Sequence, residues 1–276
     1  MSEKYDLIAL DMDDTLLKSD KTVSDETIDI FKKVRKAGKY VVICTGRPLS
    51  ELSPYKETFK DLHYYILESG ALVYNNFSRK ITARHTMDAN AVRQIIDVFN
   101  KEDMMVQIMI DGQSVVDREK VPRMAHFSMA PYVSLYTETA KLVDDVVPVI
   151  KEHLSDIEKM NLYHTSREAS VRTSDRLAEK NLPIERIYAE LASLELSPNG
   201  VHKGVGLRDL AAHLGIPIER TIAVGDADND IPMLEAAGLS LAVANANDHA
   251  KAAADEVLPY DQNHDACRYA IEKYIL

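Results

Sequence analysis

The strongest constraint on the fold of this chain is the alternation of short apolar runs with segments of helical spacing. Residues 7–10, 40–44 and 64–67 are mainly apolar and too short for helices, so we predict three strands. Between the first two, Ser24 can cap a helix that Gly38 ends. Short apolar strands that alternate with helices predict a parallel sheet covered by helices on both faces.

The same alternation returns near the C-terminus. The pattern predicts helices at 203–214 and 231–237, and strands at 221–224 and 239–243. Because parallel sheets are built from such repeating units, these segments would complete the sheet that the N-terminal strands begin. We therefore predict an α/β protein with a Rossmann-like, doubly wound parallel sheet as its core.

The middle of the chain is richer in Met and in charge, and its pattern is different. Strands are predicted at 105–110, 159–164 and 193–196, and helices at 89–99 and 140–153. Such a mixture fits an α+β domain inserted between two halves of an α/β core. We expect residues 1–84 and 194–276 to form the core and residues 85–193 to form the insertion.

Four polar clusters lie at or near the predicted carboxyl ends of core strands. They are residues 11–15, residues 45–47, the segment at Lys203, and residues 225–230. Ligands of open α/β sheets bind beyond the carboxyl ends of the strands. Segments that are far apart in the sequence would therefore meet at one site.

Two of these clusters are dense in carboxylates. Residues 11–14 contain three Asp, and residues 226–230 contain three more. Two carboxylates ~4 Å apart repel by ~1 kcal/mol in water and by ~4 kcal/mol at an effective dielectric constant of about 20. A divalent cation would absorb this charge, and Mg²⁺ prefers oxygen ligands with positions left for water and phosphate. The alternative interpretation is a pair of solvated acidic turns at strand ends.

The residue types also fit phosphoryl transfer, which needs a nucleophile, charge stabilisation and a proton donor for the leaving oxygen. Asp11 directly follows a predicted strand and is the best-placed carboxylate nucleophile. Asp13, two residues later, can act as general acid and then as general base. Thr45 offers a hydroxyl and turn amides to phosphate oxygens, and Lys203 offers a cation.

At these positions the chain resembles the haloacid dehalogenase-like hydrolases. The matching segments, in motif order, are residues 11–17, residues 45–48, Lys203-Gly204, and Gly225-Asp226 with Asn229-Asp230. Their order and spacing are similar to those of the Cof-type phosphatases, which carry a large α/β cap domain between the second and third motifs. The resemblance implies that residues 85–193 form such a cap.

The resemblance also implies a role for each matching residue. Asp11 would be the nucleophile and a Mg²⁺ ligand, Asp13 the general acid/base and a ligand through its backbone carbonyl, and Asp226 the remaining protein ligand. The residues implied to bind or support the phosphoryl group are Thr45, Gly46, Lys203 and Asn229, with Arg47 and Asp230 as supporting residues. Within that set, Asp230 would orient Lys203 or a water molecule.

The chain departs from the pattern of the family at Asp14, at Ser69 and in the tail segment 262–267, which is weaker than the usual ending. Asp14 stands where many relatives have Gly, and we expect its side chain to point outward. Ser69 stands where Asn is usual, which would alter contacts at the cap hinge. None of these positions belongs to the implied catalytic set, but Ser69 argues against transferring a relative's substrate to this chain.

Composition narrows the classes of partner. The formal net charge of −11 argues against a nucleic acid or an anionic membrane as the main partner. The sequence contains no apolar run near the ~20 residues of a membrane span, and its two cysteines do not make a disulfide framework. We expect no secretory leader, a cytoplasmic location, and a monomer or homodimer that binds a small phosphorylated metabolite.

The predicted function is hydrolysis of phosphomonoesters of small metabolites through an aspartyl-phosphate intermediate, with Mg²⁺ as cofactor. Sugar phosphates, flavin mononucleotide-type compounds and pyridoxal phosphate all remain open as substrates. One alternative is a phosphotransferase or phosphomutase, in which a second hydroxyl accepts the phosphoryl group. The other is a non-catalytic regulator that binds a phosphorylated metabolite.

Overall fold

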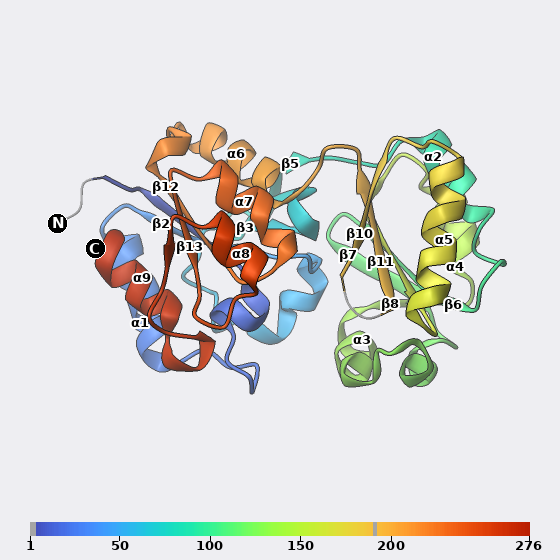
Figure 1. Cartoon of the computed structure of the whole chain (residues 1–276), viewed down its shortest axis with the longest axis horizontal. Helices are drawn as coiled ribbons and strands as arrows, with labels where there is room; N and C mark the ends of the chain where they lie inside the picture. Colours follow the sequence, from blue (N-terminus) through green and yellow to red (C-terminus); the bar gives the residue numbers. More distant parts are fainter. Residues whose placement is uncertain (1–3, 190–191) are drawn as a thin grey trace. The chain divides into compact units, whose positions relative to one another are not determined.

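The computed structural model describes residues 4–189 and 192–276, and it divides into two compact units (Figure 1). We call them the core unit and the cap unit. The core unit consists of Met1–Gly46, Pro54–Arg84 and His202–Leu276, and the cap unit of Arg47–Ser53 and His85–Val201. The predicted limits of the core and of the insertion stay a prediction.

The described part of the core unit is built on one eight-stranded sheet. Its strands are β1 Leu7–Leu10, β2 Tyr40–Cys44, β3 Tyr64–Leu67, β4 Leu72–Asn75, β5 Lys80–Arg84, β12 Thr221–Gly225, β13 Leu239–Ala242 and β14 Glu256–Val257. They lie in the order β14-β13-β12-β1-β2-β3-β4-β5. The strands from β14 to β3 are parallel, whereas β4 and β5 add antiparallel pairs at one edge. The direction of winding changes between β1 and β12, where sheets of this kind bind ligands.

Helices cover both faces of the core sheet. Helices α1 Asp25–Lys36 and α9 Ala266–Tyr274 lie on one face, and α6 Lys203–Leu214, α7 Ile231–Ala236 and α8 Asp248–Ala253 lie on the other (Figure 1). The Ser24 hydroxyl caps α1 by accepting a hydrogen bond from the Thr27 amide at 3.3 Å, as the sequence predicts. All four residues of β1 are fully buried between the helical layers, which explains why that run is entirely apolar.

The cap unit has a sheet of its own, with six strands in the part of the chain described here. They are β6 Met104–Ile110, β7 Gln113–Asp117, β8 Lys141–Val143, β9 Ile157–His164, β10 Ile184–Tyr188 and β11 Ser193–Pro198. Their order is β10-β11-β9-β6-β7-β8, and all pairs except β7 with β8 are antiparallel. Asp111 and Gly112 both have positive φ and form the two-residue turn between β6 and β7, as a tight hairpin requires.

The two faces of the cap sheet bury different sets of side chains. The cap helices are α2 Ala89–Ile96, α3 Val133–Thr139, α4 Val146–Glu152 and α5 Arg167–Glu179. Helices α2, α4 and α5 pack apolar residues such as Val92, Ile150 and Leu177 against one face. On the other face, Phe127 and Tyr136 belong to a second apolar cluster. Among all the described helices, none combines the length and the apolar character that a membrane crossing needs.

The predicted fold class is confirmed, because a parallel α/β core is joined to a separate α+β unit. The helix predicted at 140–153 is wrong in its first part, where β8 lies, and α4 begins only at Val146. The reason is the Asp144-Asp145 pair, since the Asp145 carboxylate caps α4 by accepting from the Val147 amide at 2.9 Å. The helix predicted at 89–99 ends at Ile96.

Candidate active site

Three predicted site residues lie at the carboxyl ends of three adjacent parallel strands. In the central strand, Leu10 pairs with Ile43 of β2 and with Val224 of β12. The residue after β1 is Asp11, and Thr45 and Asp226 directly follow β2 and β12. The topology therefore brings together residues that are far apart in the sequence. Asp11 and Asp226 are separated by more than 200 positions along the chain.

A fully buried lysine joins two of the acidic residues. Lys203 is the first residue of α6 and is 1% exposed. Its Nζ donates to Asp11 Oδ1 at 2.5 Å and to Asp230 Oδ1 at 2.6 Å. Burial lowers the pKa of Lys203, but the charges of Asp11 and Asp230 outweigh it and hold this pKa well above its usual range. The two carboxylates therefore stabilise the ammonium form of Lys203 at the end of β1.

Asp230 is fixed on its other side by the backbone of the second acidic cluster. Its Oδ2 accepts from the amides of Asp226 and Ala227 at 2.9 and 3.1 Å. A Cβ atom at Gly225 would lie 2.5 Å from the Asp230 side chain, so only glycine leaves room for this contact. Asp230 thus ties the loop after β12 to the lysine of α6, and both of its oxygens are engaged.

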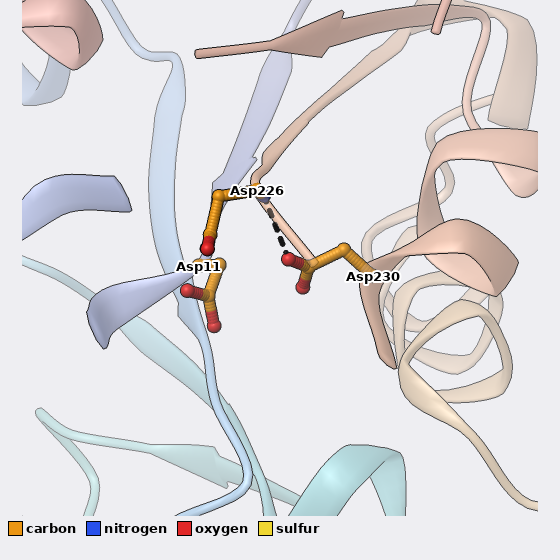
Figure 2. Close-up of side chains that lie close together, drawn as sticks. All are labelled: Asp11, Asp226 and Asp230. Atoms are coloured by element: carbon orange, nitrogen blue, oxygen red, sulfur yellow. Dashed lines mark hydrogen bonds between the residues drawn. The ribbon is translucent and has the colours of Figure 1, made fainter. Parts of the chain in front are cut away.

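Three carboxylates are close enough to share one cation (Figure 2). One oxygen each of Asp11, Asp226 and Asp230 lies within 4.8 Å of the others. All these donors are oxygens, which is the ligand type that Mg²⁺ prefers, so the residues present fit this ion. Because Asp230 already binds Lys203 and two amides, Asp11 and Asp226 have the oxygens best placed for a metal ion. The predicted ligand set of Asp11, Asp13 and Asp226 stays a prediction.

The charges of this cluster disfavour one another. Burial and the neighbouring Asp230 charge raise the pKa of Asp11 well above its usual range, against the opposing effect of Lys203. Burial and Asp230 also raise the pKa of Asp226 to about 6, although the hydrogen bond from Thr15 lowers it. A bound divalent cation would stabilise both carboxylates, so the electrostatics also fit a metal site.

The predicted general acid/base lies in the turn after β1 and is partly exposed. Asp13 Oδ1 accepts a hydrogen bond from Lys21 Nζ at 3.1 Å. The next residue, Asp14, has φ 58° and an exposed side chain. Its outward orientation agrees with the expectation, and the positive φ explains why a glycine would suit this position.

The other predicted residues are distributed between the two units. Thr45 is buried, its amide donates to the Ile66 carbonyl at 2.9 Å, and its carbonyl accepts from the Ser69 amide at 3.0 Å. Gly46 ends the first segment of the core unit, and Arg47 begins the first segment of the cap unit. The exposed Asn229 lies in the short helical turn Asp228–Asp230. The roles implied for these residues stay predictions.

Two site residues have no assigned role in the sequence-based prediction. The Thr15 hydroxyl donates to Asp226 Oδ1 at 2.8 Å and so links the two acidic clusters. The Asn245 side chain donates to the Asp14 carbonyl at 2.7 Å and accepts from the Gln262 amide at 3.2 Å. Thr15 could have been found from the sequence, because it stands inside the first acidic cluster. Asn245 could not, because no sequence motif surrounds it.

Comparisons with known proteins agree with this arrangement. A family model described as haloacid dehalogenase-like hydrolase matches residues 8–271. The chain is 28% identical over 283 residues to the 5-amino-6-(5-phospho-D-ribitylamino)uracil phosphatase YitU of Bacillus subtilis, with 100% of both chains covered. It is 26% identical over 260 residues to the pyridoxal phosphate phosphatase YbhA of Escherichia coli, with 91% of this chain and 92% of that protein covered.

Solved structures share the fold. The crystal structure of a haloacid dehalogenase-like hydrolase from Bacteroides thetaiotaomicron has a TM-score of 0.84 at 22% identity, covering 98% of this chain and 99% of that one. The family match spans most of the chain and includes the ends of β1, β2 and β12. The chain therefore belongs to the haloacid dehalogenase-like hydrolase family, in its Cof-type branch, and is an enzyme of the phosphoric monoester hydrolase class.

Proposed function

We propose that this enzyme is a Mg²⁺-dependent phosphatase that hydrolyses phosphomonoesters of small metabolites through an aspartyl phosphate at Asp11. The observation that carries the proposal is the geometry at the end of β1. There, Asp11 lies within hydrogen-bond distance of the buried Lys203 and close to Asp226. A nucleophilic carboxylate needs both a fixed orientation and nearby positive charge, because phosphoryl transfer depends mainly on positioning and electrostatics.

In the first step, Asp11 attacks phosphorus and the leaving oxygen takes a proton from Asp13. Lys203 binds Oδ1 of Asp11, so Oδ2 is the oxygen that attacks. The ammonium has three N–H groups, of which two are directed to Asp11 and Asp230, and the third can bind a phosphoryl oxygen. The hydroxyl of Thr45 and the amides of the turn at Gly46 bind the remaining phosphoryl oxygens.

In the second step, Asp13 accepts a proton from a water molecule that attacks the aspartyl phosphate. Free phosphate leaves and the Asp11 carboxylate is regenerated. Asp11, Asp226 and the Asp13 carbonyl would hold Mg²⁺, which would supply charge neutralisation at the phosphoryl group. The Thr15 hydroxyl holds Asp226 in place for that role.

We propose small phosphorylated metabolites as substrates. The two relatives described above are named for a phosphorylated ribityl compound and for pyridoxal phosphate. Both are small phosphomonoesters, which supports the class of substrate.

The test is a panel of phosphomonoesters that includes sugar phosphates, pyridoxal phosphate and nitrophenyl phosphate, assayed with Mg²⁺ and with EDTA. We expect turnover with Mg²⁺ that EDTA abolishes and that added Mg²⁺ restores. The isosteric Asp11→Asn variant should lose turnover by at least about 1,000-fold, because it removes the nucleophile. If that variant kept turnover within about tenfold of wild type, the assignment of Asp11 as the nucleophile would be refuted. Phosphorus NMR would reveal a transferase if a phosphorylated acceptor formed in place of free phosphate.

A further inference from the structure

We call Thr45-Gly46 the phosphate-binding turn, and the segment that follows it belongs to the cap unit. We call Arg47–Ser53 the strap. Thr45 and Gly46 belong to the core unit, and the strap begins at the next residue. Only Arg47, Pro48 and Leu49 separate Gly46 from Ser50, and the proline ring fixes one of the backbone angles in between. Because this connection is short and stiff, a displacement of Ser50 would also displace Gly46.

The strap is anchored on the β6–β7 hairpin of the cap unit. The Ser50 amide donates to the Gly112 carbonyl at 2.9 Å, and the Ser114 amide donates to the Ser50 hydroxyl at 3.1 Å. Gly112 lies in the tight hairpin turn, and Ser114 is a fully buried residue of β7. These two bonds fix the strap to a rigid part of the cap sheet.

A buried carboxylate adds a third anchor. Glu51 is 5% exposed, and its Oε1 accepts a hydrogen bond at 2.8 Å from Nε2 of Gln107, a residue of β6 with no exposed surface. The same Nε2 donates to the Ser114 hydroxyl at 2.8 Å. Gln107 Oε1 accepts from Tyr136, Tyr163 and Asn161 at 2.8 to 2.9 Å. The amide of Gln107 is thus held by five bonds, and buried networks of this kind are costly to distort.

We propose that Glu51 and Gln107 are positioning residues for the phosphate-binding turn, on which they act through the backbone of the strap that directly follows it. This proposal rests on the proposed role of Thr45 and Gly46 in binding the phosphoryl group. Upstream, Thr45 is held by the backbone of Ile66 in β3 and of Ser69 just after β3. Downstream, the turn continues directly into the strap, so loss of the Glu51 anchor removes a restraint on the chain that leaves the turn.

The experiment measures the inhibition constant of inorganic phosphate in the full-length enzyme with Mg²⁺. We expect Glu51→Ala to raise this constant about fivefold, which is typical of coupling through packed side chains. The KM values of nitrophenyl phosphate and of a sugar phosphate should rise by the same factor, because the phosphoryl group is common to both. Glu51→Gln keeps the acceptor oxygen and should restore the wild-type constant.

The matched control is Tyr136→Phe, which removes a hydroxyl that donates to Oε1 of Gln107, on the opposite side of the amide from the nitrogen that binds Glu51. We expect it to leave the phosphate constant within about twofold of wild type. A merely structural role for Glu51 predicts a smaller active fraction, which lowers the maximal rate and leaves the inhibition constant unchanged. That result, or an equal shift in Tyr136→Phe, would overturn the proposal.

Two further variants keep the test decisive. If Glu51→Ala does not fold, Ser50→Ala removes a different anchor at the partly exposed middle residue of the strap, and it should raise the phosphate constant about twofold. An unchanged constant would then contradict the proposal. Thr45→Val reports on the turn itself. If Thr45→Val leaves phosphate binding unchanged, the proposed role of Thr45 is wrong. If Thr45→Val weakens phosphate binding but the strap variants do not, only the proposed coupling between the strap and the turn is refuted.

Discussion

At the scale of single residues, Asp230 and Lys203 determine the geometry of the site. Lys203 is a buried cation whose two carboxylate partners keep it charged, and Asp230 is a buried anion that also accepts from two backbone amides. Buried charges of this kind are stable only while every partner is in place. The pair therefore positions the Asp11 carboxylate, and removal of either residue would leave a buried charge without its partner.

The first prediction concerns Asp230→Asn. An Asn amide must turn an NH₂ group toward either Lys203 or the amides of Asp226 and Ala227, all of which are donors. We expect a loss of about 2–4 kcal/mol in the free energy of unfolding, measured with urea. The control is Asp228→Asn in the same turn, where the side chain is exposed and the change should stay below about 0.5 kcal/mol. Equal effects of the two substitutions would contradict the assigned role.

At the scale of elements, the close packing of α6 against α7 decides where Lys203 lies. A Cβ atom at Gly204 would be 2.1 Å from the carbonyl oxygen of Pro232, at the start of α7. Backbone atoms cannot give way as a flexible side chain can, so only glycine permits this approach. The packing of α6 against α7 therefore explains why the residue after Lys203 is glycine.

The second prediction follows from this contact. Gly204→Ala should separate the first turn of α6 from α7, lower the free energy of unfolding by about 1–3 kcal/mol and displace Lys203. Urea unfolding and the turnover number measure the two effects. Arg208→Ala, at an exposed position of the same helix, is the matched control and should change neither by much. If the alanine variant kept both stability and turnover, the packing argument would be wrong.

The sequence predicts those elements whose local signals agree with their environment. Helix α6 begins and ends where its pattern and Gly215 indicate, and β1, β2 and β3 match the predicted apolar runs. The helix predicted at 140–153 began too early for two reasons: the three-residue β8 leaves almost no periodic signal, and the cap that starts α4 is Asp145. Asn245 could not be found, since its contact with the Asp14 carbonyl exists only once distant loops have met.

At the scale of the whole molecule, each unit has its own sheet and its own buried core. Each unit therefore has its own free energy of unfolding. In the cap unit, an ion cluster joins the segment before β6 to helix α5. Glu102 accepts from Arg172 at 2.7 and 2.8 Å and from Arg176 at 2.7 Å. These hydrogen bonds lower the pKa of Glu102 to about 2.

The third prediction is the pH dependence of this cluster. Because the folded-state pKa of Glu102 lies below its ordinary value, its stabilisation is present above about pH 4.5 and is lost as the pH falls toward 2. We expect Glu102→Gln to lower the free energy of unfolding of the cap unit by about 1–2 kcal/mol at neutral pH, after allowance for screening at the exposed arginines. Thermal unfolding across that range should show the difference from wild type shrinking in acid. A difference that stays constant would exclude the ion cluster as its cause.

The central claim is that Asp11 carries the phosphoryl group during turnover, and trapping that group tests it most directly. Asp13→Asn slows the water attack, so this variant should accumulate phosphoenzyme when given nitrophenyl phosphate, whose leaving group needs no acid. After acid quench, mass spectrometry should place one phosphoryl group on the peptide that contains Asp11, and Asp11→Asn should show none. A phosphoryl group on any other residue, or its absence while nitrophenol is released in a burst, would contradict the account.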